Sequence, residues 1–248
     1  MKEYEKVSNY KLMKKQPVIL WVDGRAFHTF TRGLTKPFDR VLNHTMTQTM
    51  QDMVDNIQNA KIAYTQSDEI AIILADTDKL ETSSWLNYRV QKMASMGASM
   101  ATMYFNDHWK ENVFGDLGHA EYGIDEETRE WKGYWFAQRK AMFDCRVFNL
   151  PEHEVENWLL WRQQDFMRNS VQMFARSIFS HNELHGRNTA EMKKMCFERG
   201  QSWEKLPVHL KYGTFATKVG MVWPTLMVDL NRDFVRRVVG IDKHEWDK

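Results

Sequence analysis

Apolar residues alternate between short unbroken runs and helical spacings along the first half of the chain. Residues 17–27 (PVILWVDGRAF) contain one such run and predict a buried strand, and residues 39–57, in which apolar residues recur every three or four positions, predict an amphipathic helix. Two shorter apolar runs, Ile62–Tyr64 and Ile70–Leu74, flank a polar tip and predict a hairpin. Residues 84–104, rich in methionine and small residues, predict a long helix.

A further apolar run at 141–150 (AMFDCRVFNL) predicts another strand. The order strand, helix, hairpin, helix, strand is typical of a split βαβ sheet with helices on one face. A helix over 151–180, with Pro151 near its start, and a shorter helix over 188–200 follow. We therefore expect an α+β fold with an antiparallel sheet and a helical C-terminal part.

No repeat and no low-complexity linker divides the chain, so a single domain over residues 1–248 is expected. Residues 107–140 mix glycine, charge and aromatic side chains without a clear period, and we interpret them as a surface insertion. Residues 203–248 are expected to form loops, a strand within 212–219 (YGTFATKV) and a basic-apolar tail.

Composition and charge exclude few classes of protein. The 34 basic and 33 acidic residues nearly balance, which gives no hint of a nucleic-acid partner but leaves room for a local basic patch. The two cysteines, Cys145 and Cys196, form no CxxC pair, so we expect neither a disulfide framework nor a zinc site. The first residues lack the apolar core of a signal peptide, and no run of about 18 apolar residues occurs. These features predict a soluble, cytoplasmic protein without a membrane segment.

The first predicted strand ends on a carboxylate, a glycine and a guanidinium in succession: Asp23, Gly24 and Arg25. One interpretation is a solvated turn, because Asp-Gly pairs favour turns. The other starts from the hairpin tip, since Asp68 would face Asp23 if the first strand and the hairpin were neighbours. Two such carboxylates repel unless a cation lies between them, and Mg²⁺ matches carboxylate and carbonyl oxygens and also binds phosphates. On that interpretation the strand presents Asp23 and the carbonyl of Gly24 to a metal.

Basic residues follow the first strand, at Arg25, His28, Arg32 and Lys36. Arg89 and Lys92 lie three positions apart, on one face of the predicted long helix. Positive groups beside a metal site suit a triphosphate, whereas a solvated helix face explains the same pair without a ligand.

The predicted helix 151–180 places Arg162, Asp165 and Asn169 on an otherwise apolar side. Polar groups on such a side need partners. They either form an internal network that fixes helix packing or meet a ligand.

Five motifs, in order, resemble the tRNA-His guanylyltransferase family, including its branch of guanylyltransferase-like 3′–5′ polymerases. They are VILWVDGRAFHTFTRGLTKPFD, IAYTQSDEIAIIL, FDCRVFNLP, WRQQDFMRNS and KYGTF, and they cover most of residues 17–218. The resemblance implies a palm-like domain similar to that of 5′–3′ polymerases and nucleotidyl cyclases. It also implies the addition of nucleotides to the 5′ end of a tRNA.

The resemblance implies cofactors and partners as well. ATP activates the 5′-monophosphate, and the 3′-hydroxyl of GTP or another NTP then attacks the activated end. Two Mg²⁺ ions, ATP as activator, GTP as substrate and tRNA as partner are therefore expected. The family also implies a homo-oligomer, a tetramer or a dimer, with no membrane.

The resemblance further assigns roles to residues of this chain. The metal ligands of the family match Asp23, the backbone of Gly24 and Asp68, and Glu69 completes the acidic, catalytic set. The implied nucleotide-binding positions are Asp23, Gly24, Arg25, Ala26, Phe27, His28, Lys36, Ser67 and Asp68. The residues expected to contact phosphates or the tRNA 5′ end are Arg89, Lys92, Arg162 and Asn169.

One motif departs from the family pattern. Members that add G to tRNA-His have a His-x-Asn-Asn run after the WRQxD motif, whereas this chain has Met167-Arg168-Asn169-Ser170. This version resembles the polymerase-like branch, whose members repair truncated tRNA 5′ ends by templated addition. Both dedicated tRNA-His guanylylation and templated repair remain open at this point.

Two other functions fit the same motifs. A cyclase-like palm enzyme would act on an NTP alone, without RNA. A non-catalytic tRNA-binding protein could use the same scaffold, although a retired site need not keep Asp23, Ser67, Asp68 and Glu69 together.

Overall fold

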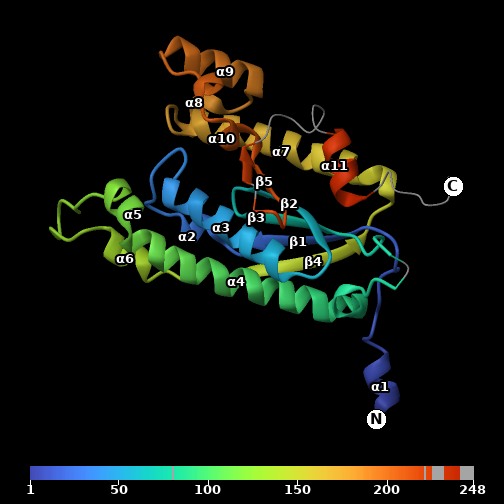
Figure 1. Cartoon of the computed structure of the whole chain (residues 1–248). Helices are drawn as coiled ribbons and strands as arrows, with labels where there is room; N and C mark the ends of the chain where they lie inside the picture. The colour runs from blue at the N-terminus through green and yellow to red at the C-terminus, as the bar shows by residue number, and fades with distance from the viewer. Residues whose placement is uncertain (80, 221, 225–231, 241–248) are drawn as a thin grey trace.

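A six-stranded antiparallel sheet forms the centre of the computed structural model, which describes residues 1–79, 81–220, 222–224 and 232–240 (Figure 1). The strands lie in the order β4-β1-β3-β2-β5-β6, and each neighbouring pair is antiparallel. Their bounds are β1 Val18–Gly24, β2 Ala60–Gln66, β3 Glu69–Leu74, β4 Phe143–Asn149, β5 Thr214–Ala216 and β6 Val222–Pro224. The predicted α+β class and antiparallel sheet are confirmed.

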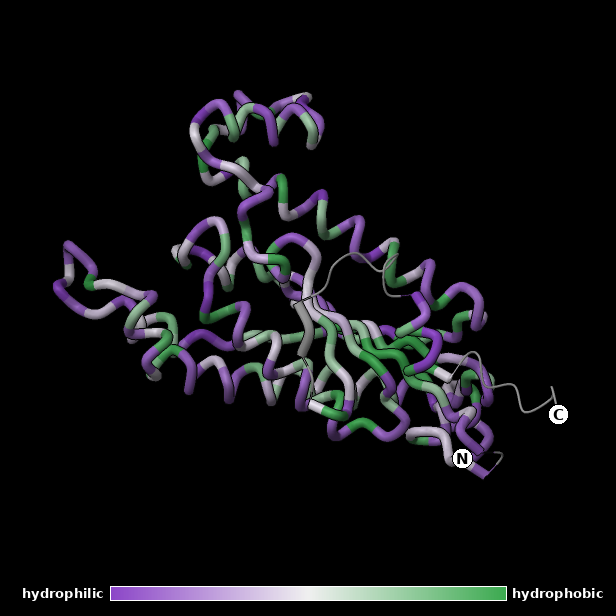
Figure 2. Tube along the Cα trace, turned by 45° about the horizontal axis from the view of Figure 1, so that its top comes forward, coloured by the Kyte–Doolittle hydropathy of each residue, from purple (hydrophilic) through white to green (hydrophobic). Residues whose placement is uncertain are grey.

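Strand β1 lies in the interior of the sheet, between β3 and β4. Its residues Val18, Ile19 and Leu20 are all 0% exposed. Successive residues of a strand point to opposite faces, so an unbroken apolar run requires that both faces be covered. The central strands accordingly form the most hydrophobic part of the trace in Figure 2.

Helices cover both faces of the sheet (Figure 1). On one face lie α3 (Arg40–Asn56) and α4 (Val90–Phe114), in one apolar cluster with Leu20. On the other face lie α7 (Val155–Arg176) and α11 (Arg232–Val239), in the cluster that contains Ile19. The predicted helical layer is confirmed in α3 and α4, and the predicted helical C-terminal part supplies the second layer.

Short elements connect these layers. They are α1 Lys2–Lys6, α2 Phe27–Phe30, η1 Trp85–Tyr88, α5 Asp116–Glu121, α6 Gly133–Ala137, η2 Glu152–Glu154, α8 His181–Leu184, α9 Thr189–Glu198, η3 Trp203–Lys205 and α10 Val208–Tyr212. Among all helices of the described residues, none has the length and apolar character needed to span a bilayer.

The long helix predicted over 84–104 begins and ends later than expected, at Val90 and Phe114. Leu86, Asn87 and Tyr88 adopt positive φ angles of 51–54°, which an α-helix does not allow, so helical geometry starts only after them. At the other end the helix continues through the first part of 107–140, where Trp109 is 0% exposed. This segment is therefore packed into the core in part, and whether it is an insertion stays a prediction.

The C-terminal part agrees with several local predictions. Asn188 caps α9, its side chain accepting a hydrogen bond from the amide of Glu191 at 3.0 Å, and Gly200 follows the helix with φ 77°. The strand predicted within 212–219 is present as β5, which covers only Thr214–Ala216. The loops and tail expected over the rest of 203–248 are wrong in part, because α10 and α11 are helices there, while residues 225–231 and 241–248 lie outside the described residues.

Replacing Asp39 by alanine is expected to lower the free energy of unfolding by about 2 kcal/mol. Asp39 is 4% exposed and caps α3, where its carboxylate accepts from the amides of Leu42 (2.8 Å) and Thr35 (3.1 Å). It also accepts from the Tyr122 hydroxyl at 2.9 Å, which alanine would leave unpaired. Urea unfolding measures the loss, with Tyr122→Phe as the comparison that removes only the last bond. Equal midpoints for Asp39→Ala and the unmodified protein would contradict this account of the cap.

Candidate active site

The end of β1 meets the tip of the β2–β3 hairpin. The amide of Gly24 donates a 3.0 Å hydrogen bond to the carbonyl of Asp68, and Asp23 stands opposite Glu69 in the register of β1 and β3. The carboxylate of Asp23 is close enough to that of Asp68 to help raise the pKa of Asp68. The expected proximity of strand end and hairpin tip is confirmed.

Gly24 is required by close packing at the strand end. A Cβ built on Gly24 would lie 2.3 Å from the ring of Phe27, which is buried in the core that includes Phe105. Ala26 then takes a left-handed conformation with φ 54°, and α2 begins at Phe27. The Asp23-Gly24-Arg25 stretch therefore does make a turn, and the same turn leaves the Asp23 carboxylate at the sheet edge.

Negative charge dominates this edge. Burial, and to a smaller degree the carboxylates of Asp23 and Glu69, raises the pKa of Asp68 to about 6, although the Ser67 hydroxyl donates a 2.8 Å hydrogen bond that favours the charged form. Burial also raises the pKa of Asp23, and Asp144 adds to the effect. The facing cation is Arg146, whose Nη2 lies 3.5 Å from the Asp23 carboxylate.

The donor set at this edge fits a hard divalent cation. Two carboxylates and the carbonyl of Gly24 offer oxygen ligands only, and excess negative charge favours a cation. Within the part of the chain that the structure describes, no three His, Cys, Asp or Glu side chains are grouped as in a metal site made by protein alone. Mg²⁺ suits such a partial site, because it is commonly held by one or two carboxylates together with water and the phosphates of a ligand.

Glu69 is held by a buried arginine. Its carboxylate accepts hydrogen bonds from Arg162 Nη2 and, at 2.9 Å, from Gln66 Nε2. Arg162 is 5% exposed, and its guanidinium lies 5.0 Å from the ring centre of Trp21. The polar residues on the 151–180 helix were expected either to form an internal network that fixes helix packing or to meet a ligand. Arg162 fits the internal network. This contact ties α7 to the hairpin tip, and a catalytic role for Glu69 stays a prediction.

A cavity of about 330 Å³, here called the first cavity, lies next to the Asp68 carboxylate. Five of the predicted nucleotide-binding residues line it: Phe27, His28, Lys36, Ser67 and Asp68. Its volume falls within the range typical of small-ligand sites. The cavity thus brings together residues from α2, the loop before α3 and the hairpin tip.

Helix α7 also lines this cavity, which the sequence did not predict. The α7 side of the cavity consists of Phe166, Met173, Arg176 and Ser177. Arg176 is a second basic residue that lines the cavity, in addition to Lys36, and the local sequence pattern does not indicate this position. Asn169, by contrast, is exposed on α7 and is not among the residues that line the cavity. The other four predicted nucleotide-binding residues, Asp23, Gly24, Arg25 and Ala26, also do not line it, and Arg25 and Ala26 are exposed on the turn.

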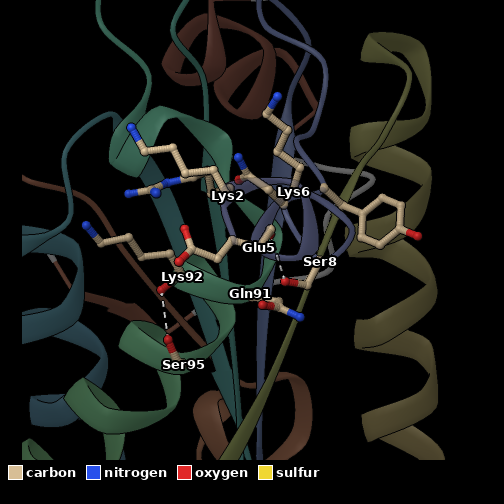
Figure 3. Close-up of a pocket in the computed structure, with 10 residues that line it drawn as sticks. Lys2, Glu5, Lys6, Ser8, Gln91, Lys92 and Ser95 are labelled. Atoms are coloured by element: carbon tan, nitrogen blue, oxygen red, sulfur yellow. Dashed lines mark hydrogen bonds between the residues drawn. The ribbon is translucent and has the colours of Figure 1, made fainter.

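Arg89 and Lys92 lie away from the carboxylates. They line a separate cavity of about 590 Å³ together with Lys2, Lys6 and Glu5, between α1 and the start of α4 (Figure 3). Thr102 lies near the end of β1, since its hydroxyl accepts a hydrogen bond from the amide of Phe143, which pairs with Gly24. Along the helix axis, Arg89 lies roughly 20 Å and Lys92 roughly 15 Å before Thr102. Within one chain, Arg89 and Lys92 therefore do not line the 330 Å³ cavity next to Asp68.

Comparisons with known protein sequences identify relatives of this chain. The family model described as tRNAHis guanylyltransferase matches residues 1–151. An uncharacterized protein of Acanthamoeba polyphaga mimivirus is 30% identical over 229 residues, which cover 88% of this chain and 75% of that protein. A probable tRNA(His) guanylyltransferase of Mus musculus is 27% identical over 176 residues, 68% of this chain and 51% of the mouse protein. The match thus spans about half the length of the mouse relative.

Solved structures are similar over nearly the whole chain. A bacterial tRNA(His) guanylyltransferase-like protein in complex with ATP has a TM-score of 0.85 and 37% identity, covering 96% of this chain and 97% of that one. A complex of such a bacterial protein with GTP has a TM-score of 0.75 and 33% identity, covering 96% of each chain. The tRNA(His) guanylyltransferase of Saccharomyces cerevisiae, at 20% identity, TM-score 0.68 and coverage of 90% and 95%, shares the fold.

Proposed function

This chain belongs to the tRNAHis guanylyltransferase family, and from that premise we propose that it is a metal-dependent nucleotidyltransferase acting in the 3′–5′ direction on the 5′ end of tRNA. Its substrates are GTP or another NTP, and ATP activates a 5′-monophosphate end. Mg²⁺ as the metal, a tetrameric or dimeric assembly and a cytoplasmic location accompany this proposal as predictions.

One observation carries the proposal: Asp23 and Asp68 meet at the sheet edge beside a cavity lined by Lys36, Ser67 and His28. Carboxylates suit a metal, and a basic wall suits phosphates. The bacterial relatives bound to ATP and to GTP are similar over 96% of this chain, which supports placing either nucleotide in this cavity.

The chemistry follows from what these residues can hold. Asp23, Asp68 and the Gly24 carbonyl would bind Mg²⁺, which supplies charge neutralisation of phosphates when bound. Lys36 and Arg176 face the cavity and orient a triphosphate. The Glu69–Arg162 pair is a positioning contact, since it fixes the hairpin tip that presents Asp68. The protein thereby contributes positioning and electrostatics, which dominate phosphoryl and nucleotidyl transfer.

We further propose that the enzyme is a templated repair polymerase. The run Met167-Arg168-Asn169-Ser170 lacks the histidine found in members that add G opposite A. In the structure Ser170 is 0% exposed, and its hydroxyl donates to the carbonyl of Leu210 at 2.6 Å. Because the Ser170 side chain takes part in packing, we expect base pairing with the RNA, and not this position, to select the incoming nucleotide.

Labelled GTP is expected to enter a 5′-truncated tRNA much faster than tRNA-His. Both RNAs are 5′-monophosphorylated and incubated with ATP and Mg²⁺. The first lacks its first nucleotide and has C as the facing base, and the second is full-length tRNA-His without its extra G. Strong labelling of tRNA-His opposite its A would contradict the repair assignment but keep the enzyme class.

A second template, which differs only in the facing base, distinguishes selection of the nucleotide by base pairing from binding of the tRNA 5′ end alone. The same truncated tRNA with A as the facing base should reject GTP and accept UTP. Equal use of GTP on both templates would contradict templated selection. No labelling of any RNA, even from a 5′-triphosphate end, would contradict the enzyme and favour a tRNA-binding protein, whereas turnover of GTP alone would favour a cyclase-like activity.

A further inference from the structure

Another cavity, of about 480 Å³, lies at the first turns of α3, on the side opposite the 330 Å³ first cavity. It is called the second cavity below and is separate from the one in Figure 3. Its walls come from α3, α5, α10 and β5, which are far apart in the sequence. The residues that line it are Phe38, Arg40, Asn43, His44, Thr47, Leu117, Pro207, His209, Leu210 and Thr214. None of the sequence motifs assigns a ligand to this cavity.

The start of α3 forms a wall shared by the two cavities. Arg40, His44 and Thr47 follow the i, i+4, i+7 spacing of one helix face and line the second cavity. Leu42 and Asp39 line the first cavity. Phe38 and Asn43 line both. A ligand in the second cavity would therefore be a direct neighbour of a nucleotide in the first.

The second cavity contains one arginine and two imidazole side chains. Arg40, His44 and His209 line it, and no aspartate or glutamate is among its lining residues. Glu121, the carboxylate near this end of α3, accepts a hydrogen bond from the amide of Arg40 at 3.5 Å.

These basic side chains have no polar partners among the described residues. Within that part of the chain, neither Arg40 nor His44 forms a side-chain hydrogen bond or ion pair, and the same holds for the His209 imidazole. Arg40 and His44 are accessible to an incoming ligand, since neither side chain is buried. Burial lowers the pKa of His209, which favours the neutral imidazole, a form that can both donate and accept hydrogen bonds.

We propose that the second cavity binds the RNA strand that faces the growing 5′ end, holding one nucleotide and its flanking phosphates. This inference rests on the proposed function, because a templating nucleotide must lie beside the incoming one. The cavity volume suits a nucleotide, and Phe38, between the two cavities, offers an aromatic face on which a base can stack. Arg40 and His44 pair with the phosphates.

The test measures RNA binding by fluorescence anisotropy, with 5′-truncated tRNA and the double variant Arg40→Gln/His44→Gln. The Kd for RNA should rise about tenfold, and the slope of log K against log salt should fall by about one for each phosphate that the variant no longer neutralises. Arg129→Gln is the matched control, since Arg129 is exposed on the turn between α5 and α6 and should leave Kd unchanged. Thermal unfolding of all variants confirms that the fold is kept.

A second arm distinguishes RNA from a free nucleotide. The KM for GTP and the Kd for ATP should change less than about twofold in the double variant, because the first cavity is intact. A rise in the KM for GTP with unchanged RNA binding would overturn the inference in favour of a second nucleotide site. Unchanged RNA binding and unchanged kinetics would overturn it outright. Because anisotropy needs no catalysis, a protein that binds RNA here but incorporates nothing would refute the proposed function and not this cavity.

Discussion

Replacing Asp68 by asparagine is expected to reduce nucleotide addition by roughly a thousandfold or more, since a metal ligand worth several kcal/mol of charge stabilisation would be lost. Asparagine keeps the size of the side chain, and it removes the repulsion with Asp23 and Glu69, so the fold should be retained. Asp23→Asn should have the same effect. Single-turnover incorporation of labelled GTP into truncated tRNA at saturating Mg²⁺ measures the loss.

Asp144→Asn is the matched control for this prediction. Asp144 stands opposite Asp23 in the register of β1 and β4, and its side chain is 57% exposed. It carries the same charge at the same sheet edge, but it is not one of the two carboxylates assigned to the metal. Its variant should keep most of the activity. Near-normal activity of either Asp23→Asn or Asp68→Asn would refute the metal-ligand assignment.

Replacing Arg162 by alanine is expected to lower the free energy of unfolding by about 3 kcal/mol or more, because it leaves the Glu69 carboxylate without its main partner. The guanidinium is buried, forms an ion pair with Glu69 and lies over Trp21. Urea unfolding followed by tryptophan fluorescence measures the change. The same variant should lower kcat, since the hairpin tip that presents Asp68 is no longer tied to α7.

Arg168→Ala is the control on the same helix. Arg168 is 54% exposed and pairs only at the surface, with Asp165 at 2.9 Å, so its loss should cost less than about 0.5 kcal/mol. The double variant Arg162→Ala/Glu69→Gln should recover part of the stability, because no charge is then left unpaired. Equal costs for Arg162→Ala and Arg168→Ala would show that the buried pair does not hold the site together.

The sheet and the position of the two aspartates could be predicted because both depend on local patterns. An unbroken apolar run marks β1 as an interior strand, and a polar tip between two apolar runs marks the hairpin. The split βαβ order then makes the end of β1 a neighbour of Asp68. Asp23 and Asp68 meet in the structure for these reasons.

The remaining parts of the site depend on tertiary packing that a local pattern does not contain. The spacing of Arg89 and Lys92 predicts that they share one face of the helix. It does not predict how far along the helix they lie from the carboxylates of Asp23 and Asp68. Arg176 reaches the first cavity only because α7 crosses the sheet above it. The partner of Glu69, which is Arg162, likewise lies 93 positions away in the chain.

The most direct test of the central claim is to locate the nucleotide that the protein adds. A truncated tRNA with a 5′-triphosphate and a blocked 3′ end is incubated with α-labelled GTP and Mg²⁺, and the product is sequenced from both ends. The account predicts one additional G at the 5′ end, opposite the unpaired C, and none with the Asp23→Asn variant. Label at any other position, or an equal yield from the Asp23→Asn variant, would contradict it.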